Sequence, residues 1–149
     1  MKKTLTLMTL LLLNSGCASH KNKEATGFFL RSEFSWWEAK RVYEFKATSE
    51  NRAEILVELQ NDGNPYHLKV ADKAWSSGKN CGVYNGKSNS IKLDEAIQLS
   101  CPILNKEDML MPLAGAIKFT PPLNTKYKFI IYMQDNKPVS LSIKLANTQ

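Results

Sequence analysis

Histidine is scarce in this chain of 149 residues, which contains only His20 and His67. Catalytic systems with serine or cysteine nucleophiles need a histidine as base, and zinc sites need paired histidine or cysteine ligands. His67 alternates with Tyr66, Leu68 and Val70, which is typical of an exposed residue in a half-buried strand. Glycine-rich motifs that cradle phosphate are absent as well. These absences predict a protein with no metal and no cofactor.

Carboxylates that could work as an acid–base pair are not marked out by their positions. Glu33, Glu38, Glu54 and Glu58 are available, but the last two fall on the polar face of an alternating run. A charge on such a face needs no catalytic reason. We therefore expect a protein that is not an enzyme.

Long hydrophobic runs are also lacking. The one marked run, Leu5–Leu13, reads LTLMTLLLL and is less than half of the roughly 20 apolar residues that a transmembrane helix needs. It follows Lys2 and Lys3 and precedes small residues, an order that is typical of an export signal. Residues 1–16 are therefore predicted to be a signal peptide rather than a membrane span.

The signal ends in a serine and a glycine followed by Cys17. This ending resembles the lipobox of bacterial lipoproteins, although Asn14 stands where such signals have leucine or a small residue. The resemblance implies cleavage before Cys17 and lipidation of its thiol; ordinary cleavage after Ala18, leaving a soluble protein, is the alternative. In such lipoproteins an aspartate directly after the cysteine favours the inner membrane. Here Ala18 and Ser19 follow Cys17, so the resemblance implies that the protein is located on the periplasmic face of the outer membrane.

Cysteine occurs three times, an odd number for an exported protein. Lipidation of Cys17 leaves Cys81 and Cys101 as a pair, which an oxidising periplasm would join. No Cys-x-x-Cys spacing is present to lower the pKa of a thiol, so the pair is structural rather than redox-active. We expect one disulfide that stabilises the fold by about 3 kcal/mol.

Charge is mildly positive, at +6 for the full chain, and Lys2 and Lys3 are part of the predicted signal. Such a balance fits a solvated surface or attraction to anionic envelope material, and an exported protein is a poor candidate for nucleic-acid binding. Residues 17–26 are predicted to be the lipidated cysteine and a polar tether. Residues 27–149 are predicted to be a single β-rich periplasmic domain.

Alternating hydrophobic residues fill much of this domain and predict about seven to nine short strands, with no long helix and no repeat. The turn at Asp62–Pro65 joins two alternating runs and predicts a hairpin. Strands are also expected over residues 91–93, 96–101, 116–120, 127–133 and 139–145, with one helical turn at 105–111. The strand at 127–133 is apolar on much of both faces and is expected to lie centrally in the sheet. The predicted fold is all-β, a small antiparallel β-sandwich with one disulfide; an open β-barrel is the alternative.

Aromatic residues gather near the start of the domain, at Phe28, Phe29, Phe34, Trp36 and Trp37. One interpretation is that they fix the first strand to the core. The other is a partner site, because tryptophan is enriched at interface hot spots; Phe29, Trp36 and Trp37 are its candidates. Adjacent tryptophans in a strand would face opposite sides, so one of them would be exposed. The polar loop Ser76–Ser90, beside the disulfide, is a second candidate.

These observations favour a non-catalytic lipoprotein, anchored in the membrane by its N-terminal lipid, that binds another envelope or secreted protein. A secretion-system accessory and a toxin-immunity protein are the two roles considered. The alternative is a carrier of a small ligand or lipid. A carrier would have a cavity lined by the inward residues of the strands expected at 127–133 and 139–145.

Overall fold

The computed structural model describes residues 24–84, 88–105, 107 and 111–146. Cys17, the signal peptide 1–16 and most of the tether lie outside the described residues, as does most of the helical turn expected at 105–111. No helix among the described residues is long and apolar enough to span a membrane.

Strands and two short 3-10 helices make up the described fold. The strands are β1 (Ala25–Arg31), β2 (Glu44–Ser49), β3 (Arg52–Leu59), β4 (Tyr66–Asp72), β5 (Asn80–Cys81), β6 (Ala96–Gln98), β7 (Ile117–Phe119), β8 (Thr125–Gln134) and β9 (Lys137–Leu145). The 3-10 helices η1 (Glu33–Ser35) and η2 (Arg41–Tyr43) lie between β1 and β2. The prediction of an all-β chain is confirmed.

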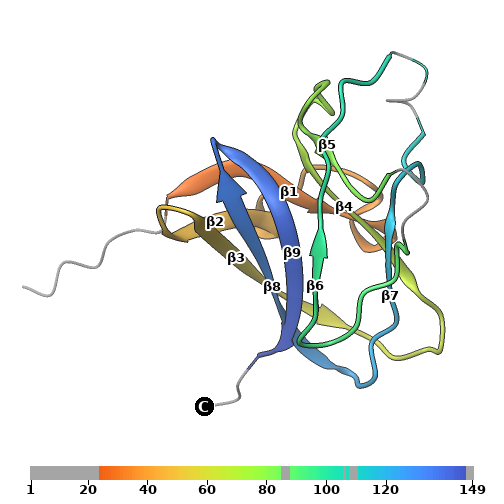
Figure 1. The fold of residues 1–149 in the computed structure, drawn as a ribbon. Helices are drawn as coiled ribbons and strands as arrows, with labels where there is room; N and C mark the ends of the chain where they lie inside the picture. The colour runs from red at the N-terminus through yellow and green to blue at the C-terminus, as the bar shows by residue number, and fades with distance from the viewer. Residues whose placement is uncertain (1–23, 85–87, 106, 108–110, 147–149) are drawn as a thin grey trace, which may run out of the picture.

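One antiparallel sheet curls around the core in the order β5-β4-β1-β2-β3-β8-β9-β6, and β7 pairs with one end of β4 (Figure 1). The two ends of this order meet, because the backbones of Gly82 and Ser100 exchange hydrogen bonds of 3.0 and 2.8 Å. The predicted disulfide between Cys81 and Cys101 is formed at the same place. The curled sheet and its single described disulfide confirm the predicted fold class.

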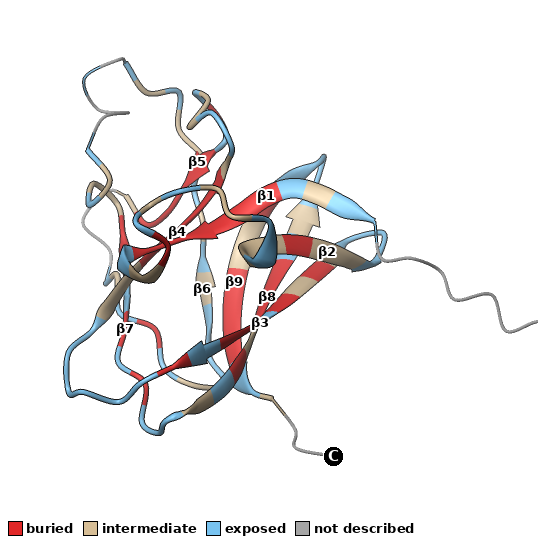
Figure 2. Ribbon diagram, turned by 180° about the vertical axis from the view of Figure 1, so that it is seen from behind, coloured by how far each residue is buried: buried red, intermediate tan, exposed pale blue. Residues whose placement is uncertain are grey.

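Alternation along the strands decides which side chains fill the interior (Figure 2). β3 buries Ala53, Ile55, Val57 and Leu59 while the residues between them face outward or remain half-buried. β8 lies between β3 and β9 and buries residues of both faces, as its two-sided apolar pattern predicted. The fully buried core includes Tyr127, Phe129, Ile131, Leu141 and Ile143.

The hairpin expected at Asp62–Pro65 is wrong. β3 pairs with β2 and β8, whereas β4 pairs with β1, β5 and β7. The connection crosses from one part of the sheet to another and is held by Asn61, whose Nδ2 donates to the carbonyl of Pro122 at 2.9 Å. A turn and two alternating runs reveal which faces are buried, but not which strands are neighbours.

Two further local expectations differ from the structure. Residues 91–93 form no strand; only Ser90 makes an isolated bridge, to Lys118. Trp36 and Trp37 do not lie in a strand with opposite orientations, because β1 ends at Arg31 and a 3-10 helix and a turn follow. The expected strands at 96–101 and 116–120 are present in shorter form, as β6 and β7.

Candidate functional site

Three tryptophans, Trp36, Trp37 and Trp75, have left-handed backbone conformations, with φ of 57°, 60° and 56°. Residues with large side chains rarely adopt positive φ, and such strain collects at sites that bind or switch. The three lie in two segments, residues 32–40 after β1 and residues 73–79 after β4, which we call the tryptophan loops. The rings of Trp37 and Trp75 pack across the two loops with centroids 6.4 Å apart.

Glu33 joins the first tryptophan loop to β4. Its Oε2 accepts the backbone N–H of His67 at 3.0 Å, and its Oε1 lies 2.6 Å from Nδ1 of the same histidine. Partial burial raises the pKa of Glu33, but hydrogen bonds from its own backbone, His67 and Ser32 outweigh burial and hold the pKa below its ordinary value. The carboxylate is therefore charged at neutral pH and holds η1 against the sheet.

Arg31 holds both tryptophan loops at once. Its guanidinium donates to the carbonyls of Trp37, Asp72 and Lys73, the last at 3.0 Å. It also lies 4.5 Å from the centroid of the Trp75 ring, a cation–π distance. Burial lowers the pKa of Arg31, and the charge of Asp72 partly opposes this effect; a guanidinium nevertheless stays charged. Arg31 is 2% exposed and fixes the geometry of the two loops.

Lys69 is the second buried cation on this outer face of the sheet, beside Arg31 in register. Its Nζ donates to the Tyr84 hydroxyl and to the Ala114 carbonyl, both at 2.7 Å. Burial lowers the pKa of Lys69 to about 8. Lys69 alternates in the sequence with Leu68 and Val70, so alternation alone would place it on a solvated strand face, but the surrounding loops cover that face. No catalytic partner for its amine is evident in the described residues.

The predicted partner residues occupy different environments. Trp36 is 81% exposed, Trp37 is half-buried, and Phe29 is only 8% exposed. The guanidinium of Arg31 lies 5.8 Å from the Phe29 ring, so Phe29 forms part of the support beneath the loops. The sequence did not indicate a role for Trp75 and Arg31. The two residues are far apart in the chain, and no sequence pattern shows that they are in contact in the fold.

The candidate loop Ser76–Ser90 is partly structured. Its residues Asn80 and Cys81 form β5, and residues 85–87 lie outside the described part of the chain. Gly82 cannot carry a side chain without displacement, because a Cβ there would lie 2.1 Å from the carbonyl oxygen of Gly115. The loop is therefore closely packed at its base, beside the disulfide.

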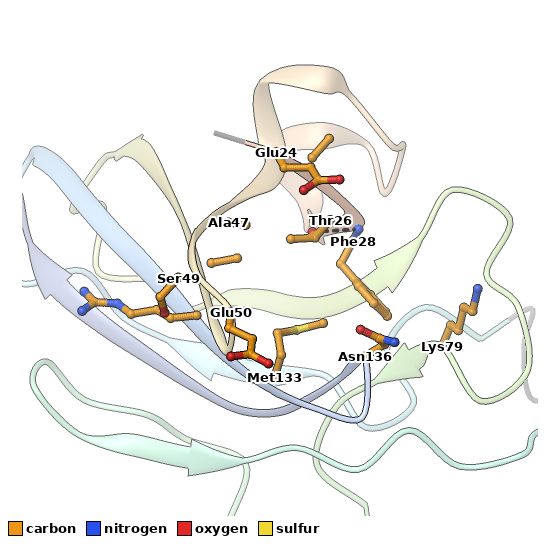
Figure 3. Close-up of a pocket in the computed structure, with 12 residues that line it drawn as sticks. Glu24, Thr26, Phe28, Ala47, Ser49, Glu50, Lys79, Met133 and Asn136 are labelled. Carbon is orange, nitrogen blue, oxygen red and sulfur yellow. Dashed lines mark hydrogen bonds between the residues drawn. The ribbon is translucent and has the colours of Figure 1, made fainter. Parts of the chain in front are cut away.

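A pocket of about 420 Å³ opens where the chain enters the domain (Figure 3). It is bounded by the start of β1, the β2–β3 hairpin, the β8–β9 turn and the segment before β5. Its lining combines apolar side chains with charged and amide groups, namely Glu24, Ala25, Thr26, Phe28, Ala47, Ser49, Glu50, Arg52, Ala53, Lys79, Met133 and Asn136. In Figure 3, Glu24 and Glu50 lie at opposite ends of the pocket, Met133 lies beside Glu50, and the Phe28 ring lies on the side toward Asn136 and Lys79.

Metal chemistry finds no support in the described residues, which contain no group of three or more histidine, cysteine or carboxylate side chains suited to a metal ion. His67 is engaged by Glu33.

Comparison with known proteins identifies a solved structure of similar fold. No family model and no curated protein matches the sequence. Among solved structures, the chain is similar to one described as "Ligand induced structure of AmyP-SBD", with a TM-score of 0.54 and 14% identity. The match covers 98% of this chain and 95% of that one. That neighbour is a starch-binding domain, a non-catalytic module of β-sandwich type, and the likeness establishes a shared fold.

Proposed function

We propose that this chain is a non-catalytic, lipid-anchored envelope protein that binds another envelope or secreted protein through Trp36. The observation that carries the proposal is the combination of 81% exposure and a left-handed backbone at this tryptophan. An exposed indole gains nothing from the fold's own core, whereas tryptophan contributes strongly when it is buried at an interface. A strained backbone conformation costs free energy and persists only where the surrounding structure enforces it, and such residues collect at binding sites.

Preorganisation of the first tryptophan loop supports this proposal. Glu33 joins η1 to His67, and Arg31 bonds to the carbonyl of Trp37 directly after Trp36. A loop that is already held in place loses little conformational entropy when a partner binds, so more of the contact energy appears as affinity.

Pull-down from detergent-solubilised envelopes tests this function, using the native chain, Trp36→Ala and Tyr132→Ala. Tyr132 is also an exposed aromatic residue, at 42% exposure, but it lies on β8. We expect a protein that is recovered by the native chain and by Tyr132→Ala and is lost with Trp36→Ala. Equal recovery by all three proteins, or no specific protein at all, would contradict the proposal.

A glycan is the second candidate ligand, favoured by the starch-binding domain that shares this fold. Exposed indole rings can stack on the apolar faces of sugar rings, and the loops present Trp36 to solvent. Electrophoresis through gels containing soluble starch separates the two candidates. Retardation that depends on Trp36 favours a glycan, and unchanged mobility with a protein partner recovered favours the leading proposal.

The carrier alternative receives less support from the packing. The inward residues Phe129, Ile131, Leu141 and Ile143 are fully buried in one core cluster. Because these side chains pack against one another in the core, they do not line a cavity in which a ligand could bind. For the protein-binding role, the neighbouring genes distinguish the two alternatives: a toxin gene would favour immunity, and a secretion operon would favour an accessory role.

A further inference from the structure

Two cations, Arg31 and Lys69, are buried beneath the tryptophan loops, on the paired strands β1 and β4 (Figure 2). Their hydrogen bonds go to backbone carbonyls and to the Tyr84 hydroxyl, which replace lost hydration but carry no net charge. Within the described residues, no salt bridge engages either side chain. The two positive charges are therefore not cancelled by a direct partner.

The carboxylates near the loops compensate this charge only in part. Glu33 and Glu38 of the first tryptophan loop each have a basic neighbour, at 2.6 and 3.9 Å. The negative charge of Asp72 acts on Arg31 and offsets part of its charge. Lys73 adds a third cation, because it is exposed and its carbonyl accepts a hydrogen bond of 3.0 Å from Arg31. Positive charge thus prevails at the two loops.

Indole rings form the surface above the buried cations. The ring centroid of Trp75 lies 4.5 Å from the Arg31 guanidinium and 6.0 Å from Nζ of Lys69. The Trp37 ring packs on Trp75 with centroids 6.4 Å apart, and both tryptophans are half-buried. The cations are therefore covered by aromatic side chains rather than by water, and charges in such surroundings are screened less than exposed charges. We expect a positive potential at the surface of the loops.

An exposed aliphatic side chain, Ile103, lies beside the second tryptophan loop. The Gly78 N–H donates to the carbonyl of Pro102 at 3.0 Å. The Leu104 N–H donates to Oγ of Ser77, also at 3.0 Å. Ile103 lies between these two held residues, yet it is 90% exposed. Like Trp36, it presents a large apolar side chain to solvent from a backbone that is fixed in place.

We propose that the tryptophan loops and Ile103 form one docking surface for an acidic protein, whose apolar contact patch is bordered by aspartate or glutamate side chains. The apolar patch covers Trp36 and Ile103, while the carboxylates approach Lys73 and the two buried cations. This inference rests on the proposed protein-binding function and adds the charge of the partner. A second copy of the chain carries the same positive loops and would be repelled, and a neutral glycan gains nothing from the charge.

Intrinsic fluorescence tests the charge of the partner, because the three tryptophans of the chain all lie in the two loops. The probes are synthetic peptides in which leucine alternates with glutamate, glutamine or lysine, titrated into the full mature chain in nonionic detergent micelles. We expect a Kd of about 0.1–1 mM for the glutamate peptide and about ten-fold weaker binding of the glutamine peptide. The lysine peptide should give no response, and added salt should weaken binding of the glutamate peptide.

Two variants and their matched controls locate the binding on the molecule. Lys73→Glu and Ile103→Ser should each weaken binding of the glutamate peptide about ten-fold. Lys144→Glu on β9 and Leu56→Ser on β3 make the same changes at exposed positions outside the loops and should keep native affinity. Native affinity in Lys73→Glu or Ile103→Ser, equal loss in Lys73→Glu and Lys144→Glu, or equal binding of the three peptides overturns the proposal.

The envelope pull-down separates this inference from the proposed function. The protein captured through Trp36 should be acidic, should be recovered less by Lys73→Glu and Ile103→Ser, and should be released by salt. A Trp36-dependent protein that both variants recover equally leaves the protein-binding function standing and overturns the acidic docking surface. Binding of the chain to phosphatidylglycerol vesicles through Ile103 and Lys73, with no acidic protein recovered, assigns the surface to a membrane and also overturns it.

Discussion

Arg31 and Lys69 lie side by side on the outer face of β1 and β4, where alternation alone would place solvent-exposed charges. The tryptophan loops and the segment around Ala114 cover this face and supply carbonyl oxygens to the two cations. A buried cation is tolerated when hydrogen bonds replace its lost hydration. The sequence could reveal the two positive residues, but not the loops that cover them.

Replacement of Arg31 by lysine is expected to loosen both tryptophan loops. Lysine cannot bond to the carbonyls of Trp37, Asp72 and Lys73 together, so buried acceptors lose their donors. We expect the free energy of unfolding to fall by about 3 kcal/mol. Urea unfolding measures this change, and near-UV circular dichroism follows the tryptophan environments.

Arg41→Lys is the control for this prediction, because Arg41 is exposed in η2. Its stability should stay within about 0.5 kcal/mol of the native value. Native stability and an unchanged near-UV spectrum in Arg31→Lys would show that Arg31 does not hold the loops.

Lys69 is expected to make the free energy of unfolding depend on pH between about 8 and 10.5. Its pKa is about 8 in the folded protein and 10.5 as the ordinary value, so the unfolded chain binds more protons between these two values. Stability therefore rises with pH from about 8 to 10.5, by about 3 kcal/mol, as the cost of burying the charged form disappears. The comparison of native protein with Lys69→Met in urea unfolding at pH 7 and 10 isolates this contribution.

Lys118→Met serves as the reference variant, because Lys118 is exposed on β7. It should keep the pH dependence of the native protein, whereas Lys69→Met should lose the rise. An equal rise in all three proteins would assign the effect to other groups.

Element by element, alternation predicted burial better than pairing. It matches the buried residues of β3 and the central place of β8. On β9 it holds for Leu141 and Ile143 but is wrong at the end of the strand, where Leu145 is exposed and Ser142 is buried. It failed at β3 and β4, which follow one another along the chain but lie apart in the sheet. Side-chain period records the environment of a strand, while the partner depends on long-range contacts that no local pattern encodes.

The loops were the least predictable elements of the candidate site. Trp36 and Trp37 could be selected from composition, but their left-handed backbone depends on the turn that follows η1. The pocket draws on four separate parts of the chain, from Glu24 to Asn136. Only the curled sheet brings these parts together.

The disulfide is expected to matter most where the sheet closes. β5 pairs with β4 through only two residue pairs, and the Cys81–Cys101 bond joins it to the segment after β6. The bond closes a loop with a sequence separation of 20, so replacing both cysteines by serine should lower the free energy of unfolding by about 3 kcal/mol.

Hydrogen exchange locates this effect. The amides of Gly82 and Ser100 bond to each other's carbonyls beside the disulfide. They should exchange faster in the double variant, while amides of β3 and β8 change only through the lower global stability. Uniform acceleration across the sheet would contradict a local role in closure.

At the scale of the whole molecule, the pocket and η1 lie at opposite ends of β1. Glu24 directly precedes this seven-residue strand, and Glu33 follows it closely, so the strand separates the two by about 20 Å. With a tether at the pocket end, η1 and Trp36 would extend away from the membrane. This arrangement would leave the first tryptophan loop accessible to a partner.

The odd cysteine count makes the anchor testable without knowledge of any partner. With Cys81 and Cys101 joined, the remaining cysteine, Cys17, is free to receive lipid. We expect labelled palmitate to enter the native chain and to be lost in Cys17→Ser, with the disulfide retained. Multiple acyl chains give stable anchoring because each buried CH₂ contributes about 0.8 kcal/mol.

The double variant Cys81→Ser/Cys101→Ser controls for altered folding and export, and it should still incorporate the label. Intact mass of the native protein provides the second readout, with a mature N-terminus at Cys17 and a mass increased by acyl chains. Incorporation of label by Cys17→Ser, or an unacylated N-terminus in the native protein, would contradict the proposed lipid anchor at Cys17. The domain would then meet its partner in solution.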